Sequence, residues 1–257
     1  MGAAHAIRLQ IETKLAERVP AALTLKIKHA PEVFATGINA VDEMLGGGIP
    51  RGCITEVSGE ASTGKTSFAL STIASITQLG NACAWVDVND ALSPEAAAAA
   101  GVELRRLLWL RMSAERGKKV ADKPWSRLEQ ALKATDLLLQ TGGFGAIVLD
   151  MSDLVPQHAG RIPLATWYRF RLAAEQARTS LIFLTQSPCA SSCASLALRC
   201  ELAETTPFSS NGETPLFERR QYQLARERNR NDATAFMQRK PVQRVSWRAE
   251  TLWSRVR

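Results

Sequence analysis

The chain has 257 residues, of which 46% are hydrophobic, and carries 32 lysines and arginines against 25 aspartates and glutamates. This length suits one sizeable α/β domain with small appendages at most, and the apolar content argues against extensive disorder. No apolar run reaches the ~18 residues that a membrane span needs, and residues 1–7 lack the layout of a signal peptide. We therefore expect a cytoplasmic protein without a membrane partner.

The excess positive charge lies at the C-terminal end of the chain. Residues 217–257 hold 11 basic and 4 acidic side chains, a net +7 that equals the net charge of the whole chain. An arginine-rich segment of this kind favours contact with a polyanion such as DNA, although a solvated basic face or an acidic protein partner would suit the same composition. Five cysteines at irregular spacing favour reduced thiols over a disulfide framework.

The first elements in chain order are short. Ile7, Ile11 and Leu15 recur every four residues within residues 4–18, as in an amphipathic helix, and residues 25–28 alternate apolar and basic side chains, as in an edge strand. We expect these elements to form an N-terminal appendage (residues 1–33) ahead of a core at residues 34–257. The core opens with a short helix at residues 40–45 and a glycine-rich turn.

Residues 59–66 fit the pattern G-x-x-x-x-G-K-[ST] of a phosphate-binding loop. A predicted strand (residues 53–58) runs into the loop and a predicted helix (residues 67–78) follows it, so that the helix N-terminus faces the bound anion. Lys65 would lie between the β- and γ-phosphates and Thr66 would hold Mg²⁺. The predicted cofactors are ATP and Mg²⁺, held by Gly59, Glu60, Ala61, Ser62, Thr63, Gly64, Lys65, Thr66 and Ser67.

Strands and helices alternate through the middle of the chain. Strands are predicted at residues 82–87, 107–110, 146–150 and 181–185. Between them, Ser93 is predicted to cap one helix, and Ser126 with Glu129 forms the capping box of another that ends at residues 142–143. A further helix is expected at residues 166–178, and residues 113–123 are expected to form an exposed loop.

Two strand ends carry side chains suited to the nucleotide site. Asp150 ends an apolar strand at the edge of the sheet where its carboxylate can reach Mg²⁺. Gln186 ends the next strand and would sense the γ-phosphate. Lys65, Asp150 and Gln186 are therefore the predicted catalytic residues, with Thr66 and Asp150 at the metal.

Strands alone are predicted after residue 186, at residues 197–202, 221–225 and 243–247. Strands that alternate with helices build a parallel sheet, whereas consecutive strands favour antiparallel pairing. The predicted fold class is α/β, with a mostly parallel central sheet flanked by helices and antiparallel strands at its C-terminal edge.

The chain resembles RecA-fold ATPases over most of its length. The resemblance is carried by the loop itself and by residues 36–37, 42, 45–46, 48–52, 87–94, 150 and 186. Residues 99–109, 128–132 and 171–175 are similar to the RecA-like mutasome accessory family (ImuA), which is encoded with an inactive Y-family polymerase homologue. The resemblance implies a RecA-type core and a role in bacterial DNA repair and damage tolerance, within the SOS response and translesion synthesis.

Departures from the RecA pattern change the expected activity. Asn89 stands where RecA has a catalytic glutamate, and an amide is no general base, so slow ATP hydrolysis by a weak ATPase is expected. The RecA loops that contact DNA are replaced by residues 155–164 and by the small side chains of residues 187–195. Nonspecific contact with single-stranded DNA would then use arginines, among them Arg161, Arg169 and Arg171.

Arg226 and Arg228 fall where RecA has two lysines that reach the ATP of a neighbouring protomer, so the resemblance implies a place at the cofactor site in trans. Contact of the two arginines with the DNA backbone or with solvent is the alternative. The expected function is ATP-gated assembly on DNA, with itself, with RecA or with an error-prone polymerase, in the nucleoid of the cytoplasm. A minimal recombinase with DNA-dependent ATPase activity is the alternative. A protein-binding adaptor that uses its phosphate loop only for structure is a third candidate.

Overall fold

The computed structural model describes residues 32–112, 124–202, 221–229 and 242–248. The expected N-terminal appendage lies outside this part of the chain except for Glu32 and Val33, and so does the predicted loop at residues 113–123. The compact unit that contains the described residues begins at Glu32. None of the helices described there is long and apolar enough to span a bilayer.

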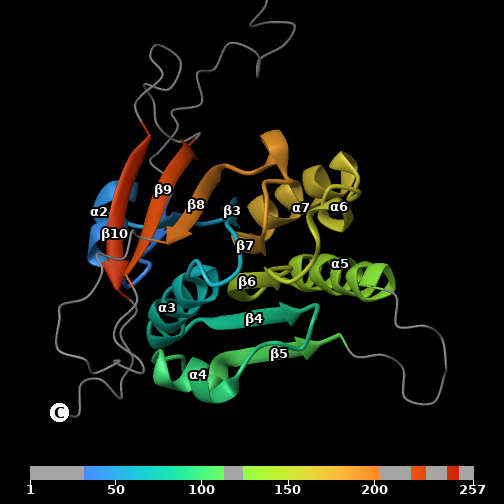
Figure 1. Ribbon diagram of the computed structural model, residues 1–257. Coiled ribbons are helices and arrows are strands. Elements are labelled where there is room, and N and C mark those ends of the chain that lie inside the picture. The colour runs from blue at the N-terminus through green and yellow to red at the C-terminus, as the bar shows by residue number, and fades with distance from the viewer. Residues whose placement is uncertain (1–31, 113–123, 203–220, 230–241, 249–257) are drawn as a thin grey trace, which may run out of the picture. The chain divides into compact units, whose positions relative to one another are not determined.

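The helices and strands predicted within the described residues are present in the predicted order, together with short elements that the sequence did not predict (Figure 1). They are β1 (Val33–Phe34), α2 (Asn39–Leu45), β2 (Ile49–Pro50), β3 (Ile54–Ser58), α3 (Lys65–Gln78), β4 (Ala82–Asp87), α4 (Pro94–Ala99), η1 (Leu104–Arg106), β5 (Leu107–Arg111), α5 (Pro124–Thr141), β6 (Phe144–Asp150), α6 (Pro156–Ala159), α7 (Leu164–Ala177), β7 (Ser180–Thr185), η2 (Ser191–Cys193), β8 (Leu196–Leu202), β9 (Gln221–Asn229) and β10 (Gln243–Arg248).

The central sheet has eight strands in the order β10-β9-β8-β3-β7-β6-β4-β5. The six strands from β8 to β5 are parallel, while β9 and β10 extend the sheet as antiparallel strands (Figure 1). The predicted fold class is therefore confirmed. The strand β3, which leads into residues 59–66, lies inside the sheet between β7 and β8, so the loop is supported on both sides.

Helices cover both faces of the parallel strands, and successive side chains of each strand enter different cores. Along β6, Ala146 and Val148 belong to the core under α2, α3 and α4, whereas Ile147 and Leu149 belong to the core under α5 and α7. In the second core the indole of Trp167 stacks on the ring of Phe183, 4.7 Å between centroids. Strands buried on both faces explain the continuous apolar runs in the sequence.

The helix boundaries confirm one predicted cap and correct another. The hydroxyl of Ser93 accepts a hydrogen bond from the backbone N–H of Ala96 at 3.1 Å, so Ser93 caps α4 as predicted. The capping box was wrong, because α5 begins at Pro124 and Ser126 lies inside its first turn. Proline suits the first turn of a helix, and Glu129 instead accepts a hydrogen bond from the indole of Trp125 at 2.7 Å.

Candidate functional site

Residues 59–66 connect β3 to α3 at the carboxyl edge of the parallel strands, with a backbone that requires both of the glycines in its pattern. A Cβ on Gly59 would lie 2.4 Å from the carbonyl oxygen of Cys200. Gly64 has a φ of 91° and its Cβ would lie 2.7 Å from the ring of Tyr222. Only glycine tolerates both the contact and the positive φ, so the loop has the shape of a phosphate cradle that β8 and β9 support from outside.

Lys65 is the first residue of α3 and only 4% exposed. Its ammonium donates to the carbonyl oxygens of Gly59 at 2.5 Å and Glu60 at 2.6 Å. Burial lowers the pKa of Lys65, although nearby acidic groups, Asp150 among them, oppose the shift. The loop therefore concentrates a buried positive charge next to the N-terminus of a 14-residue helix, where an anion is stabilised.

Thr66 and Asp150, which the sequence predicts as metal ligands, lie at the start of α3 and at the end of β6. Thr66 is exposed in the first turn of α3, and Asp150 is the last residue of β6. The Oδ1 atom of Asp150 accepts a hydrogen bond from the backbone N–H of Ser152 at 3.0 Å. Burial raises the pKa of Asp150, the charge of Asp87 adds to the shift, and the bond from Ser152 opposes it. A bound cation would stabilise the ionised form of this buried carboxylate, so Asp150 is suited to act as a metal ligand.

The raised pKa of Asp150 predicts a trade-off between stability and metal binding. Because the folded chain disfavours the ionised carboxylate, stability should rise as the pH falls from neutral through the folded pKa. We expect Asp150→Asn to raise the thermal unfolding midpoint by a few degrees at neutral pH without nucleotide and to flatten its pH dependence. The variant should also lose stabilisation by Mg²⁺ with ATP. Thermal unfolding between about pH 5 and pH 8 tests this, with Glu43→Gln, at an exposed residue of α2, as control; a lower midpoint for Asp150→Asn would contradict it.

The segment after β4 holds no carboxylate that is free to activate water. The carboxylate of Asp87 accepts hydrogen bonds from the backbone N–H groups of Ala91 at 3.1 Å and Leu92 at 2.9 Å, and from the indole of Trp109 at 3.2 Å.

The second carboxylate, that of Asp90, binds the guanidinium of Arg111 through two hydrogen bonds of 2.5 and 2.6 Å, which lower the pKa of Asp90. Asp87 therefore holds the turn, and Asp90 is engaged in an ion pair next to Asn89.

Gln186 directly follows β7, whose last carbonyl, that of Thr185, accepts from the N–H of Gly59 at 3.2 Å. The structure thus brings Gln186 beside the first residue of the phosphate loop. The segment after Gln186 is tied down by Glu56, a buried residue of β3 whose Oε1 accepts from the N–H groups of Cys189 at 2.6 Å and Ala190 at 3.1 Å. No local sequence pattern indicates this role of Glu56, because its two hydrogen-bond partners lie more than 130 residues later in the chain.

Arg226 and Arg228 point to opposite faces of the sheet. Arg226 pairs with Leu198 and Arg228 with the preceding residue, Ala197, because a bulge in β9 adds one residue between them. Neighbouring residues of β8 face opposite sides, and cross-strand partners share a face. Accordingly, Arg226 donates to the carbonyl of Met44 in α2 at 3.2 Å, whereas Arg228 donates to the carbonyl of Ala194, next to η2, at 3.1 Å.

Both arginines are also distant from the phosphate loop of their own chain. Tyr222, near the start of β9, contacts Gly64, and the strand then runs away from the loop. Arg226 and Arg228 lie four and six residues further on, roughly 13 and 20 Å along an extended strand. The structure therefore does not bring them together with Lys65, Thr66 and Asp150 in one protomer.

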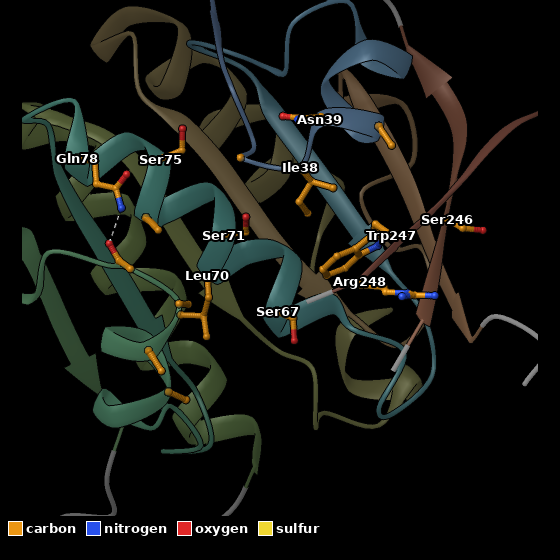
Figure 2. A pocket seen from close by; sticks show the side chains of 17 residues that line it. Ile38, Asn39, Ser67, Leu70, Ser71, Ser75, Gln78, Ser246, Trp247 and Arg248 are labelled. Atoms are coloured by element: carbon orange, nitrogen blue, oxygen red, sulfur yellow. Dashed lines mark hydrogen bonds between the residues drawn. The ribbon is translucent and has the colours of Figure 1, made fainter. Parts of the chain in front are cut away.

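A cavity of about 620 Å³ opens next to the loop (Figure 2). Its walls are the outer side of α3 from Ser67 to Gln78, residues 37–40, residues 96–101 around the end of α4, and residues 246–248 of β10. Most of the lining side chains are small or polar. The indole of Trp247 is the large aromatic group there, and its buried Nε1 has no hydrogen-bond partner within the described residues.

The sequence did not indicate that Tyr222 and Trp247 belong to this site. Their rings pack 5.0 Å apart, Tyr222 against Gly64 and Trp247 at the cavity wall. The two β-strands that carry them follow the phosphate loop by more than 150 residues, so only the sheet register brings them there. An aromatic side chain among small and polar ones, in a cavity within the usual 300–1,000 Å³, fits the nucleoside part of a nucleotide.

The chain is similar to proteins of known family and structure. The family model described as the RecA N-terminal domain matches residues 4–162. The chain is 36% identical over 170 residues to the protein RecA of Saccharopolyspora erythraea, covering 60% of this chain and 45% of the relative. It is 32% identical over 192 residues to RecA of Streptomyces ambofaciens, a match that covers 69% of this chain and 48% of the relative. The chain spans about half the length of the curated relatives that it matches.

A solved structure shows the same fold. The crystal structure of the RadB recombinase superimposes with a TM-score of 0.56, covering 84% of this chain and 96% of RadB at 17% sequence identity. At this identity the similarity concerns the fold alone. It includes the mostly parallel sheet, the helices on both faces and the antiparallel edge strands.

Proposed function

The chain belongs to the family of the RecA N-terminal domain, and from this membership we propose that it is an ATP-binding protein of DNA damage tolerance that hydrolyses ATP slowly. The observation that carries the proposal is the pairing of an intact phosphate loop with a neighbouring turn that lacks a free carboxylate. In such a protein the bound nucleotide persists, and its binding rather than the energy of its hydrolysis controls assembly. The mutasome accessory role inferred from residues 99–109 fits this behaviour.

The residues fit ATP and Mg²⁺ in three respects. Gly59 and Gly64 leave a cradle that a Cβ would fill, and the ammonium of Lys65, now on loop carbonyls, can turn to a phosphate. Thr66 and Asp150 are oxygen ligands of the kind that Mg²⁺ prefers. The cavity beside Trp247 would hold the nucleoside. When bound, the metal would neutralise phosphate charge.

The positions of Arg226 and Arg228 support nucleotide-dependent assembly. Neither side chain can reach the loop of its own chain along β9, so any contact with a triphosphate must be made in a neighbouring protomer. We propose that ATP promotes self-association on single-stranded DNA and contact with RecA or an error-prone polymerase. Fast hydrolysis is not needed for such a switch, because binding alone completes the interface.

Turnover and sedimentation measured on the same samples test the proposed function. The chain is mixed with ATP, with and without single-stranded DNA. We expect ATP to shift the chain to larger assemblies, with a turnover per protomer well below that of an active recombinase assayed beside it. DNA-stimulated turnover comparable with that of the recombinase, together with strand exchange, would favour the minimal recombinase. Partner binding that survives Lys65→Ala would favour the adaptor.

Restoring a carboxylate at residue 89 should accelerate hydrolysis. General bases contribute about 10²–10⁴-fold to a rate, and the turn around Asn89 lies between β4 and α4, where Asp90 is held by Arg111. We expect Asn89→Glu to raise the ATP turnover rate at least ~10-fold, measured by phosphate release. Asn89→Gln has the same length without the carboxylate and should leave the rate unchanged. Equal rates for both variants would show that residue 89 does not limit hydrolysis.

A further inference from the structure

The helix α7 exposes a row of large apolar side chains to solvent. Leu164, Tyr168 and Leu172 are 56%, 53% and 43% exposed, and they recur every four residues. Side chains at this spacing lie above one another on one face of a helix. We name these three residues the α7 stripe. Single exposed apolar residues are common on protein surfaces, but a continuous row along one helix is typical of an interaction site.

The other faces of α7 pack against the sheet and against α5. Trp167, Phe170 and Ala174 are buried against the sheet. Along one side α7 packs against α5, and the guanidinium of Arg169 binds Asp136 of α5 at 3.1 Å (Figure 1). The α7 stripe therefore faces away from the core, and the described residues do not cover it. Because α3 and α4 lie on the opposite face of the sheet from α7, and the phosphate loop lies at the carboxyl edge of the strands, a bound nucleotide does not cover the α7 stripe.

The charges around the α7 stripe are positive. Residues 161–178 contain four arginines and one glutamate, a net charge of +3. The guanidinium of Arg171 lies over the ring of Tyr168, 5.9 Å from its centroid, so that a cation borders the apolar row. The ion pair of Arg169 with Asp136 is solvent-exposed on its arginine side, and such pairs contribute little and exchange readily with other carboxylates.

We propose that the α7 stripe and its arginines dock an acidic amphipathic segment of a protein partner. Apolar side chains of that segment would pack on Leu164, Tyr168 and Leu172, while its carboxylates pair with Arg169 and Arg171. This combination of apolar anchors and flanking charges is typical of helix-like peptide recognition. DNA is the less suitable ligand, because phosphate contacts use the arginines but gain nothing from exposed leucines.

A peptide library tests this directly. Random 16-residue peptides displayed on phage are selected on the immobilised full chain, with single-stranded DNA present to mask other basic surfaces. We expect the selected peptides to combine leucine or aromatic residues with aspartate or glutamate. One selected peptide is then titrated against purified variants by fluorescence anisotropy.

Four proteins distinguish the outcomes. We expect Tyr168→Ala/Leu172→Ser and Arg169→Ser/Arg171→Ser each to weaken peptide binding at least ~10-fold, about 1.4 kcal/mol. Leu104→Ser, which removes a leucine of equal exposure (44%) elsewhere, should bind like the unmodified chain. Thermal unfolding midpoints confirm that all variants fold, since every substituted residue lies outside the cores.

Three results would overturn the proposal. The first is selection of peptides without acidic residues, or binding that Tyr168→Ala/Leu172→Ser leaves intact. The second is a single-stranded DNA affinity that falls with both double variants while no peptide is selected, which would assign the face to DNA. The third is sedimentation in which Tyr168→Ala/Leu172→Ser alone dissociates an existing oligomer, which would make a second copy of the chain the occupant.

Discussion

Lys65→Ala should weaken ATP binding at least ~100-fold, about 2.7 kcal/mol, which lies within the range for a lost charge-assisted hydrogen bond to phosphate. The loop holds the Lys65 ammonium in a buried position on its own carbonyls, and no other basic residue lies within residues 59–66. Calorimetric titration with ATP and Mg²⁺ measures the effect. An exposed lysine of α5, Lys133, gives the control variant Lys133→Ala, which should bind normally.

The Lys65→Ala variant should stay folded, which separates lost binding from lost structure. Burial lowers the pKa of Lys65, so the folded chain holds this ammonium at a cost. Its removal should leave the thermal midpoint of the nucleotide-free chain unchanged or slightly higher. Normal ATP affinity in Lys65→Ala would mean that the loop serves structure only.

Replacing Arg226 and Arg228 together by alanine should abolish ATP-dependent self-association and leave ATP binding by the monomer intact. Arginines that reach a triphosphate in trans stabilise its charge, so a bound ATP would link two protomers through them. We expect the protein concentration for half-maximal assembly to rise at least ~10-fold. Sedimentation with and without ATP measures assembly, and Arg244→Ala, an exposed arginine of β10, is the matched control.

The single variants should differ from one another, because the bulge in β9 directs Arg226 and Arg228 to opposite faces of the sheet. A single triphosphate in a neighbouring protomer cannot lie on both faces. One single variant should therefore reproduce the loss seen in the double variant, and the other should assemble normally. Equal partial losses in both, or loss of ATP binding by the monomer, would contradict a trans role.

The order of the elements and the phosphate loop could be predicted because their signals are local. Apolar runs, glycine turns and the pattern around Lys65 lie within a few residues of one another. The strand ends at Asp150 and Gln186 follow from the same logic, since parallel strands bring their carboxyl ends to one edge. The capping box at Ser126 failed because a proline two residues earlier starts the helix.

The parts of the site that escaped prediction depend on contacts between distant segments. The sheet register places Tyr222 on Gly64 and Trp247 at the cavity, and it is fixed by packing rather than by any local motif. The bulge between Arg226 and Arg228 reverses the face that strand alternation gives to one of them. Glu56 looks like an ordinary strand residue until its two backbone partners, 133 and 134 residues later, are known.

The central claim is that the loop between β3 and α3 holds a triphosphate. The most direct test is calorimetric titration of the purified, folded full chain with ATP at millimolar magnesium. We predict saturable binding of one nucleotide per chain, weakened when magnesium is chelated. Absence of binding in that titration, with no thermal stabilisation of the same sample by ATP, would contradict the claim.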